Sequence, residues 1–137
     1  SLVVEGEAMQ PRPGHTGSVE LQTNFHPLWS EGMQLYWKDF KPGDKLSLAF
    51  DSEVEGIYYA KIQFTVAPDY GTFALRVNDK VITPEINLTN EEVSLLLVNL
   101  GQVNLKKGEN ELQIESAALA SGHDTGFFGI DKLTLRK

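Results

Sequence analysis

A run of strict alternation near the centre of the chain constrains the fold most. Apolar side chains occupy every second position from Tyr58 to Val66, and polar ones such as Lys61 and Gln63 fall between them. A period of two places the two sets on opposite faces of an extended strand. The pattern therefore predicts an antiparallel β-strand with one face buried and one face solvated.

A second alternating run, Phe73–Val77, begins a few residues later. Between the two runs, Pro68 fixes one backbone dihedral and Gly71 permits a positive one, as a tight reversal requires. We therefore predict a hairpin that joins the two runs. Asn78 and Asp79 tolerate left-handed conformations and predict a second tight turn directly afterwards.

Further strand-forming stretches are bounded by Gly, Pro, Asn and Asp, which favour turns. They are Val3–Ala8, Ser18–Gln22, Gly32–Trp37, Leu46–Phe50, Val93–Asn99, Gln102–Leu105, Glu111–Glu115 and Phe128–Arg136. Asn90 would cap a helix, but the stretch that follows it is too continuously apolar for one helical face. About ten short strands without a fixed repeat predict an all-β antiparallel sandwich. Residues 9–17 and 116–126 are expected to be loops, and residues 1–137 a single domain.

Charge and composition exclude several classes of partner and site. The chain has 137 residues with 12 Lys and Arg against 19 Asp and Glu, a net charge of -7, and no cysteine. Such a balance disfavours nucleic acids and anionic membranes. The missing thiols exclude cysteine catalysis, thiolate zinc sites and disulfides. No apolar run is long enough to span a membrane, and no signal peptide opens the chain, so we expect a mature protein or a segment of a larger one.

Catalytic motifs are absent from the sequence. A Ser-His-Asp triad would need His26 or His123, yet no Gly-x-Ser-x-Gly motif occurs, and neither does a phosphate-binding loop. The three histidines, His15 included, show no metal-ligand spacing. The 19 acids are too many to identify one hydrolytic pair. We expect a noncatalytic domain and keep a small hydrolase as a remote alternative.

Asp131 is the most informative single residue. A period of two places it on the same inward face as Leu133 and Leu135, unless a bulge intervenes. A buried carboxylate needs backbone N–H groups, a basic side chain or a cation. If the first and last strands pair, Glu5 and Glu7, which the same period places on one face, would meet Asp131 in an all-oxygen site that suits Ca²⁺. The alternative is that the two glutamates are solvated and the aspartate caps a turn.

Several short motifs share their order with a known type of domain. Val4–Ala8 reads Val-Glu-Gly-Glu-Ala, and Phe128–Leu135 reads Phe-Gly-Ile-Asp-Lys-Leu-Thr-Leu. They resemble the hydrophobic-Glu-Ala-Glu start and the Gly-Ile-Asp-x-Ile-x-Leu final strand of family 6 and family 35 carbohydrate-binding modules. Further similar stretches are Gly56–Tyr59, Ala67–Gly71, Val77–Asp79, Leu100–Leu105 and Gly108–Leu112. The likeness spans nearly the whole chain.

The resemblance implies a galactose-binding-like β-jelly roll and a noncatalytic module. In that family a structural calcium is held by residues that correspond to Glu5, Glu7 and Asp131, although Gly6 stands where the family has Ala. Such modules are appended to bacterial extracellular glycoside hydrolases. Expected partners are therefore a carbohydrate and a catalytic domain, and the expected location is secreted, periplasmic or on the cell surface. The alternative is a structural domain that packs on a catalytic domain or mediates oligomerisation without binding sugar.

Two loops contain the candidate ligand-binding residues. A sugar needs an exposed aromatic ring and planar polar groups, and Trp29 and His26 lie together in a polar loop. Trp29 would otherwise anchor that loop to the core, whereas Trp37 is expected in the core itself. Tyr70, at a turn, either stacks on a ligand or packs beneath its own turn.

The second loop precedes the last strand. His123 and Asp124 lie in its Gly-His-Asp-Thr-Gly segment, and Phe127 follows. The resembling modules present polar groups and an aromatic ring to their sugar from this position, but they usually have Asn where this chain has Asp124. The alternative is a solvated loop flanked by glycines.

Overall fold

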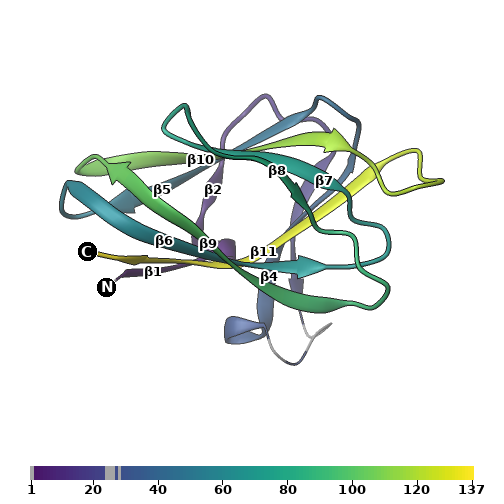
Figure 1. The fold of residues 1–137 in the computed structure, drawn as a ribbon, viewed down its shortest axis with the longest axis horizontal. Coiled ribbons are helices and arrows are strands. Elements are labelled where there is room, and N and C mark those ends of the chain that lie inside the picture. The colour runs from purple at the N-terminus through teal and green to yellow at the C-terminus, as the bar shows by residue number, and fades with distance from the viewer. Residues whose placement is uncertain (1, 24–26, 28) are drawn as a thin grey trace.

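The computed structural model describes residues 2–23, 27 and 29–137. Its two antiparallel sheets pack face to face, as Figure 1 shows, and confirm the predicted all-β sandwich. The larger sheet, sheet A, has the order β3-β4-β11-β6-β9, with β1 also paired to β11. The smaller one, sheet B, has the order β2-β5-β10-β7-β8.

The strands of each sheet come from distant parts of the chain. Sheet A contains β1 (Leu2–Glu5), β3 (Ser18–Thr23), β4 (Met33–Phe40), β6 (Gly56–Val66), β9 (Ser94–Leu105) and β11 (Gly126–Arg136). Sheet B contains β2 (Gln10–Pro11), β5 (Lys45–Ser52), β7 (Thr72–Val77), β8 (Lys80–Asn87) and β10 (Gly108–Ala118). Two short 3₁₀ helices, η1 (Gly6–Ala8) and η2 (Ser30–Gly32), complete the described elements.

The core lies between the sheets and follows the alternation read from the sequence. The inward side chains of β6, Tyr58 to Val66, are buried. Trp37 is fully buried as predicted, with its ring stacked on that of Phe40 at a centroid distance of 3.8 Å. Its indole N–H donates to the carbonyl oxygen of Thr16 at 2.7 Å, so burial leaves no unpaired donor.

The predicted hairpin between Tyr58–Val66 and Phe73–Val77 is wrong. The first run lies in β6 of sheet A and the second in β7 of sheet B. Alternation shows that each strand buries one face, but it does not show which strand it pairs with. The connection crosses from one sheet to the other, with Tyr70 buried within it and Gly71 close against the carbonyl of Ala118.

Other turns and strands match the sequence more closely. Asn78 and Asp79 have φ angles of 49° and 68°, which confirms the predicted tight turn between β7 and β8. The two strands predicted at Val93–Asn99 and Gln102–Leu105 form one strand, β9, with a register shift near Gly101, whose φ is 76°. A bulge therefore continues the strand where the sequence pattern indicated a break.

The chain ends lie side by side, as Figure 1 shows. Strands β1 and β11 pair antiparallel, which confirms the predicted pairing, with Glu5 opposite Lys132. The first strand is shorter than predicted, because the chain turns into η1 after Glu5. A Cβ at Gly6 would overlap the carbonyl oxygen of Ile130. Glycine thus allows this turn to lie against β11.

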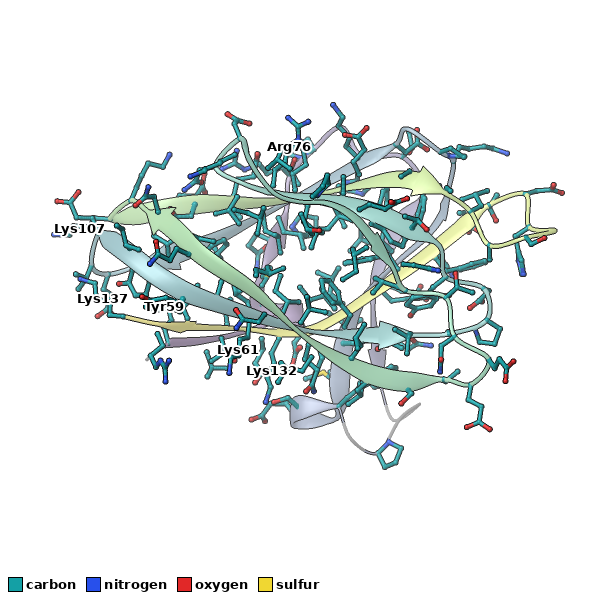
Figure 2. The ribbon with its side chains drawn as sticks, in the orientation of Figure 1. Tyr59, Lys61, Arg76, Lys107, Lys132 and Lys137 are labelled. Atoms are coloured by element: carbon teal, nitrogen blue, oxygen red, sulfur yellow. The ribbon has the colours of Figure 1, made fainter. Side chains whose placement is uncertain are left out.

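A bulge in β11 overturns the predicted orientation of Asp131. Ile130 and Leu133 both point into the core, and the register of β11 against β6 shifts between residues 130 and 132. The extra residue places Asp131 on the outer face of sheet A, the side that also carries Gln63, and not on the inward face with Leu133. Lys61, on the same outer face, points away from sheet B in Figure 2.

Candidate functional site

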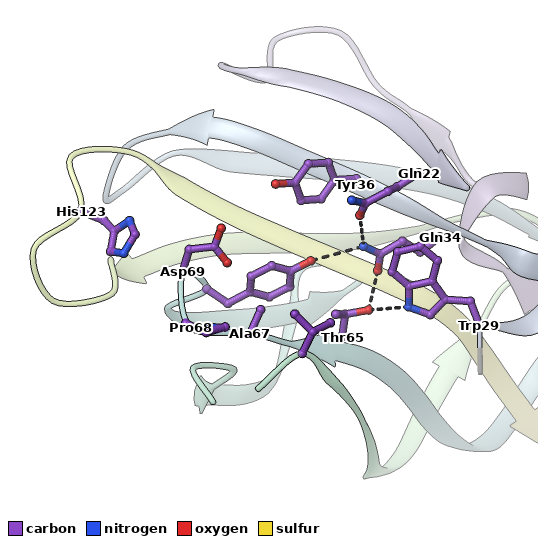
Figure 3. Close-up of a pocket in the computed structure, with 11 residues that line it drawn as sticks. Gln22, Trp29, Gln34, Tyr36, Thr65, Ala67, Pro68, Asp69 and His123 are labelled. Atoms are coloured by element: carbon purple, nitrogen blue, oxygen red, sulfur yellow. Dashed lines mark hydrogen bonds between the residues drawn. The ribbon is translucent and has the colours of Figure 1, made fainter. Parts of the chain in front are cut away.

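A pocket opens on the outer face of sheet A, beside the segment that crosses to sheet B (Figure 3). Its volume of about 340 Å³ falls within the range of small-ligand sites. Its lining residues are Gln22, Trp29, Gln34, Tyr36, Thr65, Ala67, Pro68, Asp69, Tyr70, Val93 and His123. We refer to this site as the outer-face pocket. It combines aromatic rings with planar polar side chains, which is the chemistry that sugar recognition requires.

A chain of hydrogen bonds forms the floor of the outer-face pocket (Figure 3). The indole N–H of Trp29 donates to Thr65 Oγ1 at 2.9 Å, and the Thr65 hydroxyl donates to Gln34 Oε1 at 2.6 Å. Gln34 Nε2 in turn donates to Gln22 Oε1 at 2.7 Å and to the Tyr70 hydroxyl at 3.3 Å. Five residues from separate parts of the chain are thereby held in one orientation.

The indole N–H of Trp29 is the first donor in this series of hydrogen bonds, and it sets the direction of the bonds that follow. An indole N–H can only donate, so Thr65 accepts from Trp29 and directs its own proton to Gln34. The amide of Gln34 must then turn its NH2 group toward Gln22 and Tyr70. Both of these residues accept through oxygen, and their own protons are left for a ligand. The network therefore presents hydrogen-bond donors at the pocket surface.

Strand β4 contributes to the core with one face and to the pocket with the other. Leu35 and Trp37 point inward, and Gln34 and Tyr36 alternate with them on the outer face. Gln34 is fully buried because it lies flat across Gly129 of β11, where a Cβ would overlap its side chain. Glycine at this position thus makes room for the central amide of the network.

Burial raises the pKa of both tyrosines of the pocket above the ordinary value near 10, at which a phenol is already neutral at pH 7. It raises the pKa of Tyr36 to about 12, and the negative charge of Asp69 adds to the effect. It also raises the pKa of Tyr70, partly offset by the hydrogen bond with Gln34. Both phenols are therefore neutral hydroxyl groups near pH 7. Figure 3 shows Asp69 and His123 at one end of the pocket, where they add a carboxylate acceptor and an imidazole.

Three of the predicted ligand-binding residues line the outer-face pocket: Trp29, Tyr70 and His123. Of the two alternatives for Trp29, the structure supports the anchor and not the exposed stacking platform, because this side chain is only 3% exposed and donates to Thr65. Tyr70 is 4% exposed and packs beneath its own turn, so it reaches the pocket through its hydroxyl. His123 is exposed.

Two further predicted ligand-binding residues, Asp124 and Phe127, are not among the residues that line the outer-face pocket. Asp124 is exposed, and its backbone carbonyl accepts a hydrogen bond from Lys41 Nζ at 3.3 Å. Phe127 is half-buried next to the pocket, with its ring stacked against Tyr36 at a centroid distance of 6.3 Å. His26 falls outside the described residues.

Sequence reasoning missed the polar centre of the site. Gln34 and Thr65 occupy the polar positions of alternating strands, which normally indicate a solvated face. Both are buried, because the loop that contains Trp29 and the segment that contains Tyr70 cover them. The one signal in the sequence that could have indicated Gln34 and Thr65 was their position close to the predicted ligand-binding loops.

A cluster of carboxylates lies next to the pocket, joined to it through Ser30. The backbone N–H of Ser30 donates to Asp131 Oδ1 at 2.9 Å, and its hydroxyl donates to Glu5 Oε1 at 2.7 Å. Gln63 Nε2 donates to Asp131 Oδ2 at 2.6 Å. Both oxygens of the buried Asp131 thus accept hydrogen bonds from neutral donors, but no positive charge pairs with the carboxylate through these bonds.

Two other carboxylate oxygens in this cluster are buried without a hydrogen bond, Glu5 Oε2 and Glu7 Oε1. Burial raises the pKa of Glu7, and the charges of Glu5 and Asp131 raise it further. Burial also raises the pKa of Asp131, against the opposing hydrogen bond from Ser30. Glu5 and Asp131 therefore lie close enough to Glu7 for their charges to act on its carboxyl group.

The geometry of this cluster differs from the prediction in one respect. Glu7 belongs to η1 and does not share a strand face with Glu5. In the described parts of the chain, no three acidic or histidine side chains are arranged to hold a metal ion as they stand.

Comparison with known proteins gives the fold a name. No family model matches the chain, and no curated protein does. Among solved structures, a family 35 carbohydrate-binding module from an environmental isolate superposes with a TM-score of 0.65 and 19% identity, covering 100% of this chain and 93% of that one. This chain has the fold of a family 35 carbohydrate-binding module. The resemblance stated from the sequence is thereby confirmed for the fold.

Two of the similar structures are parts of larger enzymes. A xanthan lyase from Paenibacillus superposes with a TM-score of 0.81 and 16% identity over 98% of this chain. This chain spans only 13% of the xanthan lyase. A GH26-CBM35 β-(1,4)-mannanase from Podospora anserina gives a TM-score of 0.64 and 20% identity, over 98% of this chain and 27% of that one. The same fold is thus seen in the structure of a single family 35 module and within the structures of a xanthan lyase and a mannanase.

Proposed function

We propose that this protein is a noncatalytic carbohydrate-binding module and that the outer-face pocket is its glycan site. The observation that carries the proposal is the fixed network from Trp29 to Gln22, which lies beside the ring of Tyr36. Sugars present C–H faces that pack on aromatic rings and hydroxyls that need oriented partners. Pockets of comparable size occur elsewhere on the molecule. The outer-face pocket is proposed as the glycan site because of the chemistry of its lining residues.

Each group in the pocket has a role in this mechanism. Tyr36 supplies a half-buried ring for the apolar face of a sugar, worth on the order of 1 kcal/mol beyond area burial. The NH2 group of Gln22 and the hydroxyl of Tyr70 donate to sugar oxygens, and Asp69 accepts from neighbouring hydroxyls. His123, on the exposed loop, closes one end of the pocket.

The lining gives no support for hydrolysis. Two carboxyl groups about 5 to 10 Å apart are needed to cleave a glycosidic bond. Among the described residues that line the pocket, Asp69 is the one carboxylate. A binding role without catalysis is therefore the function that these residues support.

The proposed setting is a larger secreted or cell-surface protein that processes polysaccharides. The support is the occurrence of the same fold within a xanthan lyase and a mannanase. The parts of the chain that the structure describes include no helix with the length and apolar character to cross a membrane. Partners would then be a polysaccharide and the catalytic domain of the same protein.

We further propose that the carboxylate cluster binds a structural calcium ion through Glu5, Glu7 and Asp131. Calcium prefers carboxylate oxygens and accepts irregular geometry. The two buried glutamate oxygens without hydrogen bonds are the observation in favour. In the described arrangement the side chains would have to turn toward one another to share an ion. The ion would neutralise the repulsion among them and fasten η1 to β11.

Binding is tested with an array of plant, microbial and host polysaccharides that includes xanthan and β-1,4-mannan. We expect retention of the fluorescently labelled protein on at least one glycan, and loss of that retention in the Tyr36→Ala variant. Absence of binding at millimolar oligosaccharide, with the circular dichroism of the folded protein intact, would contradict the proposal.

A further inference from the structure

The edge of sheet A formed by β9 is long, and no other described strand pairs with its free side. Strand β9 runs for 12 residues and is the last in the strand order of its sheet, hydrogen-bonded to β6 on one side. On its other side the backbone N–H and C=O groups of an edge strand are available to a further strand. Proteins usually protect such an edge with charge, proline, brevity, a β-bulge or a covering segment. Strand β9 has a bulge near Gly101, which leaves residues 94–99 as its regular part.

The other described edge strands of the two sheets have such protection. Strand β1 has four residues and ends in Glu5, and β2 has two residues and ends in Pro11. Strand β3 carries Glu20, and β8 carries Lys80, Pro84 and Glu85. Strand β9 carries neither charge nor proline, and the uncharged run extends from Val93 to Leu105.

Exposed apolar side chains lie on both faces of β9 within the run Leu95–Val98, and the exposed residues on either side of this run are polar. Leu97 lies opposite Gln63 on the outer face and is 57% exposed. Leu96 lies opposite Phe64, on the face turned toward sheet B, and is still 38% exposed. An occupant of this edge must therefore match apolar side chains above and below the sheet as well as the backbone.

We propose that β9 pairs antiparallel with β9 of a second copy of this chain, about a two-fold axis, to form one continuous sheet. Two chains of net charge -7 repel each other, and this edge is a strand along which contact brings no like charges together. Two-fold symmetry makes the contact self-complementary: with the axis near Leu96 or Leu97, the apolar run Leu95–Val98 of one copy lies against the same run of the other. A strand of different sequence would have to reproduce this pattern.

The dimer has a consequence for ligand binding, and this consequence alone rests on the proposed function. A two-fold axis through a pair of antiparallel strands is perpendicular to the sheet, so the outer faces of both copies lie on one side. Val93, just before β9, lines the outer-face pocket. Two pockets would thus flank the joint, and one long glycan would bind both with increased avidity.

Sedimentation velocity tests the dimer without any ligand. The wild-type protein is compared from micromolar to millimolar concentration with Leu97→Lys, which brings one added positive charge from each copy into the joint. Leu21→Lys is the matched control, because Leu21 is a 53% exposed leucine at the opposite edge of the same sheet. We expect a reversible wild-type dimer whose dissociation constant rises about tenfold or more in Leu97→Lys and is unchanged in Leu21→Lys.

Disulfide trapping provides a second readout that does not depend on a charged variant. The chain has no cysteine, so Leu95→Cys, Leu97→Cys and an equal mixture of the two report the registers centred on residues 95, 97 and 96. Opposite residues of an antiparallel pair have Cα atoms about 4.5 to 5.5 Å apart, within disulfide range. We expect one of these samples to crosslink faster than Leu21→Cys. A wild-type protein that stays monomeric at millimolar concentration would overturn the proposal. A dimer that Leu97→Lys does not weaken and that none of the cysteine samples crosslinks would overturn it as well.

Discussion

The indole N–H of Trp29 donates a hydrogen bond of 2.9 Å to Thr65 Oγ1. The first residue belongs to the segment that precedes η2, and the second to the polar face of β6. The bond therefore holds the side chain of Trp29 against the outer face of sheet A, where it lines the outer-face pocket. The ring of Trp29 is buried by the same contact, so its role is to shape the site.

Replacement of Thr65 by Val should destabilise the fold and weaken glycan binding together. The variant keeps the shape but removes the hydroxyl that accepts from the Trp29 N–H and donates to the Gln34 carbonyl oxygen. Loss of a buried partner costs about 1 to 3 kcal/mol, which urea unfolding measures. Thr65→Ser retains the hydroxyl and should restore most of both properties. Equal stability and affinity in all three proteins would show that the network has no such role.

Replacement of Tyr36 should separate stacking from hydrogen bonding. Tyr36→Ala removes a ring of the pocket, and its glycan dissociation constant should rise about tenfold, in line with the energy of one aromatic contact. Tyr36→Phe keeps the ring and should bind nearly as well as the wild type. Calorimetry with the glycan found on the array measures both. A larger loss of glycan affinity in Tyr36→Phe than in Tyr36→Ala would contradict a stacking role of the Tyr36 ring.

Much of the fold is predictable from the chain because alternation reports burial directly. The inward face of β6 and the core position of Trp37 follow from a period of two. Pairing does not follow from it, which is why β6 and β7 are separated into two sheets where a hairpin was predicted. The bulge at Asp131 also escapes the pattern, since one extra residue reverses the face of a side chain without changing composition.

The site was less predictable than the fold, for a related reason. Trp29, Tyr70 and His123 were found because aromatic and polar residues in loops are conspicuous. Gln34 and Thr65 were missed because polar residues on alternating strands resemble a solvated face. Only the loops that cover them, which come from distant parts of the sequence, make them part of a site.

Calcium should raise the melting temperature of the wild-type protein, and chelation with EDTA should lower it. An ion that binds only the folded state adds about 2.7 kcal/mol at a hundredfold excess over its dissociation constant. Asp131→Asn should abolish this response, since it removes a charged ligand from the cluster. Asp51→Asn, an exposed acid on β5, is the control and should respond like the wild type. A wild-type melting curve that is the same with EDTA and with calcium would rule out the ion.

Asp44 should make a small contribution to stability that disappears in acid. Hydrogen bonds from the Thr16 hydroxyl and from the Lys41 backbone N–H, the latter at 2.7 Å, lower the pKa of Asp44. A lowered folded-state pKa means that the contribution is complete above the unfolded-state pKa of about 3.9. It is lost as the pH falls through the lower folded-state value.

The pH dependence of Asp44 is measured against Asp44→Asn, whose amide does not titrate in this range. The wild-type advantage in melting temperature should be constant from pH 7 to about pH 5 and should shrink below pH 4. A difference in melting temperature between the wild type and Asp44→Asn that is unchanged at pH 2 would exclude the Asp44 carboxylate as its source.

The location of the glycan is the most direct test of the account. Titration of the ¹⁵N-labelled protein with the oligosaccharide found on the array, followed by NMR, reports each side-chain amide and indole separately. The account predicts shifts in the NH2 signals of Gln22 and Gln34 and in the indole signal of Trp29. The NH2 signal of Gln113, which donates to Ser47 in sheet B, should remain unchanged. Shifts confined to sheet B, with the signals of the outer-face pocket unmoved at saturation, would contradict it.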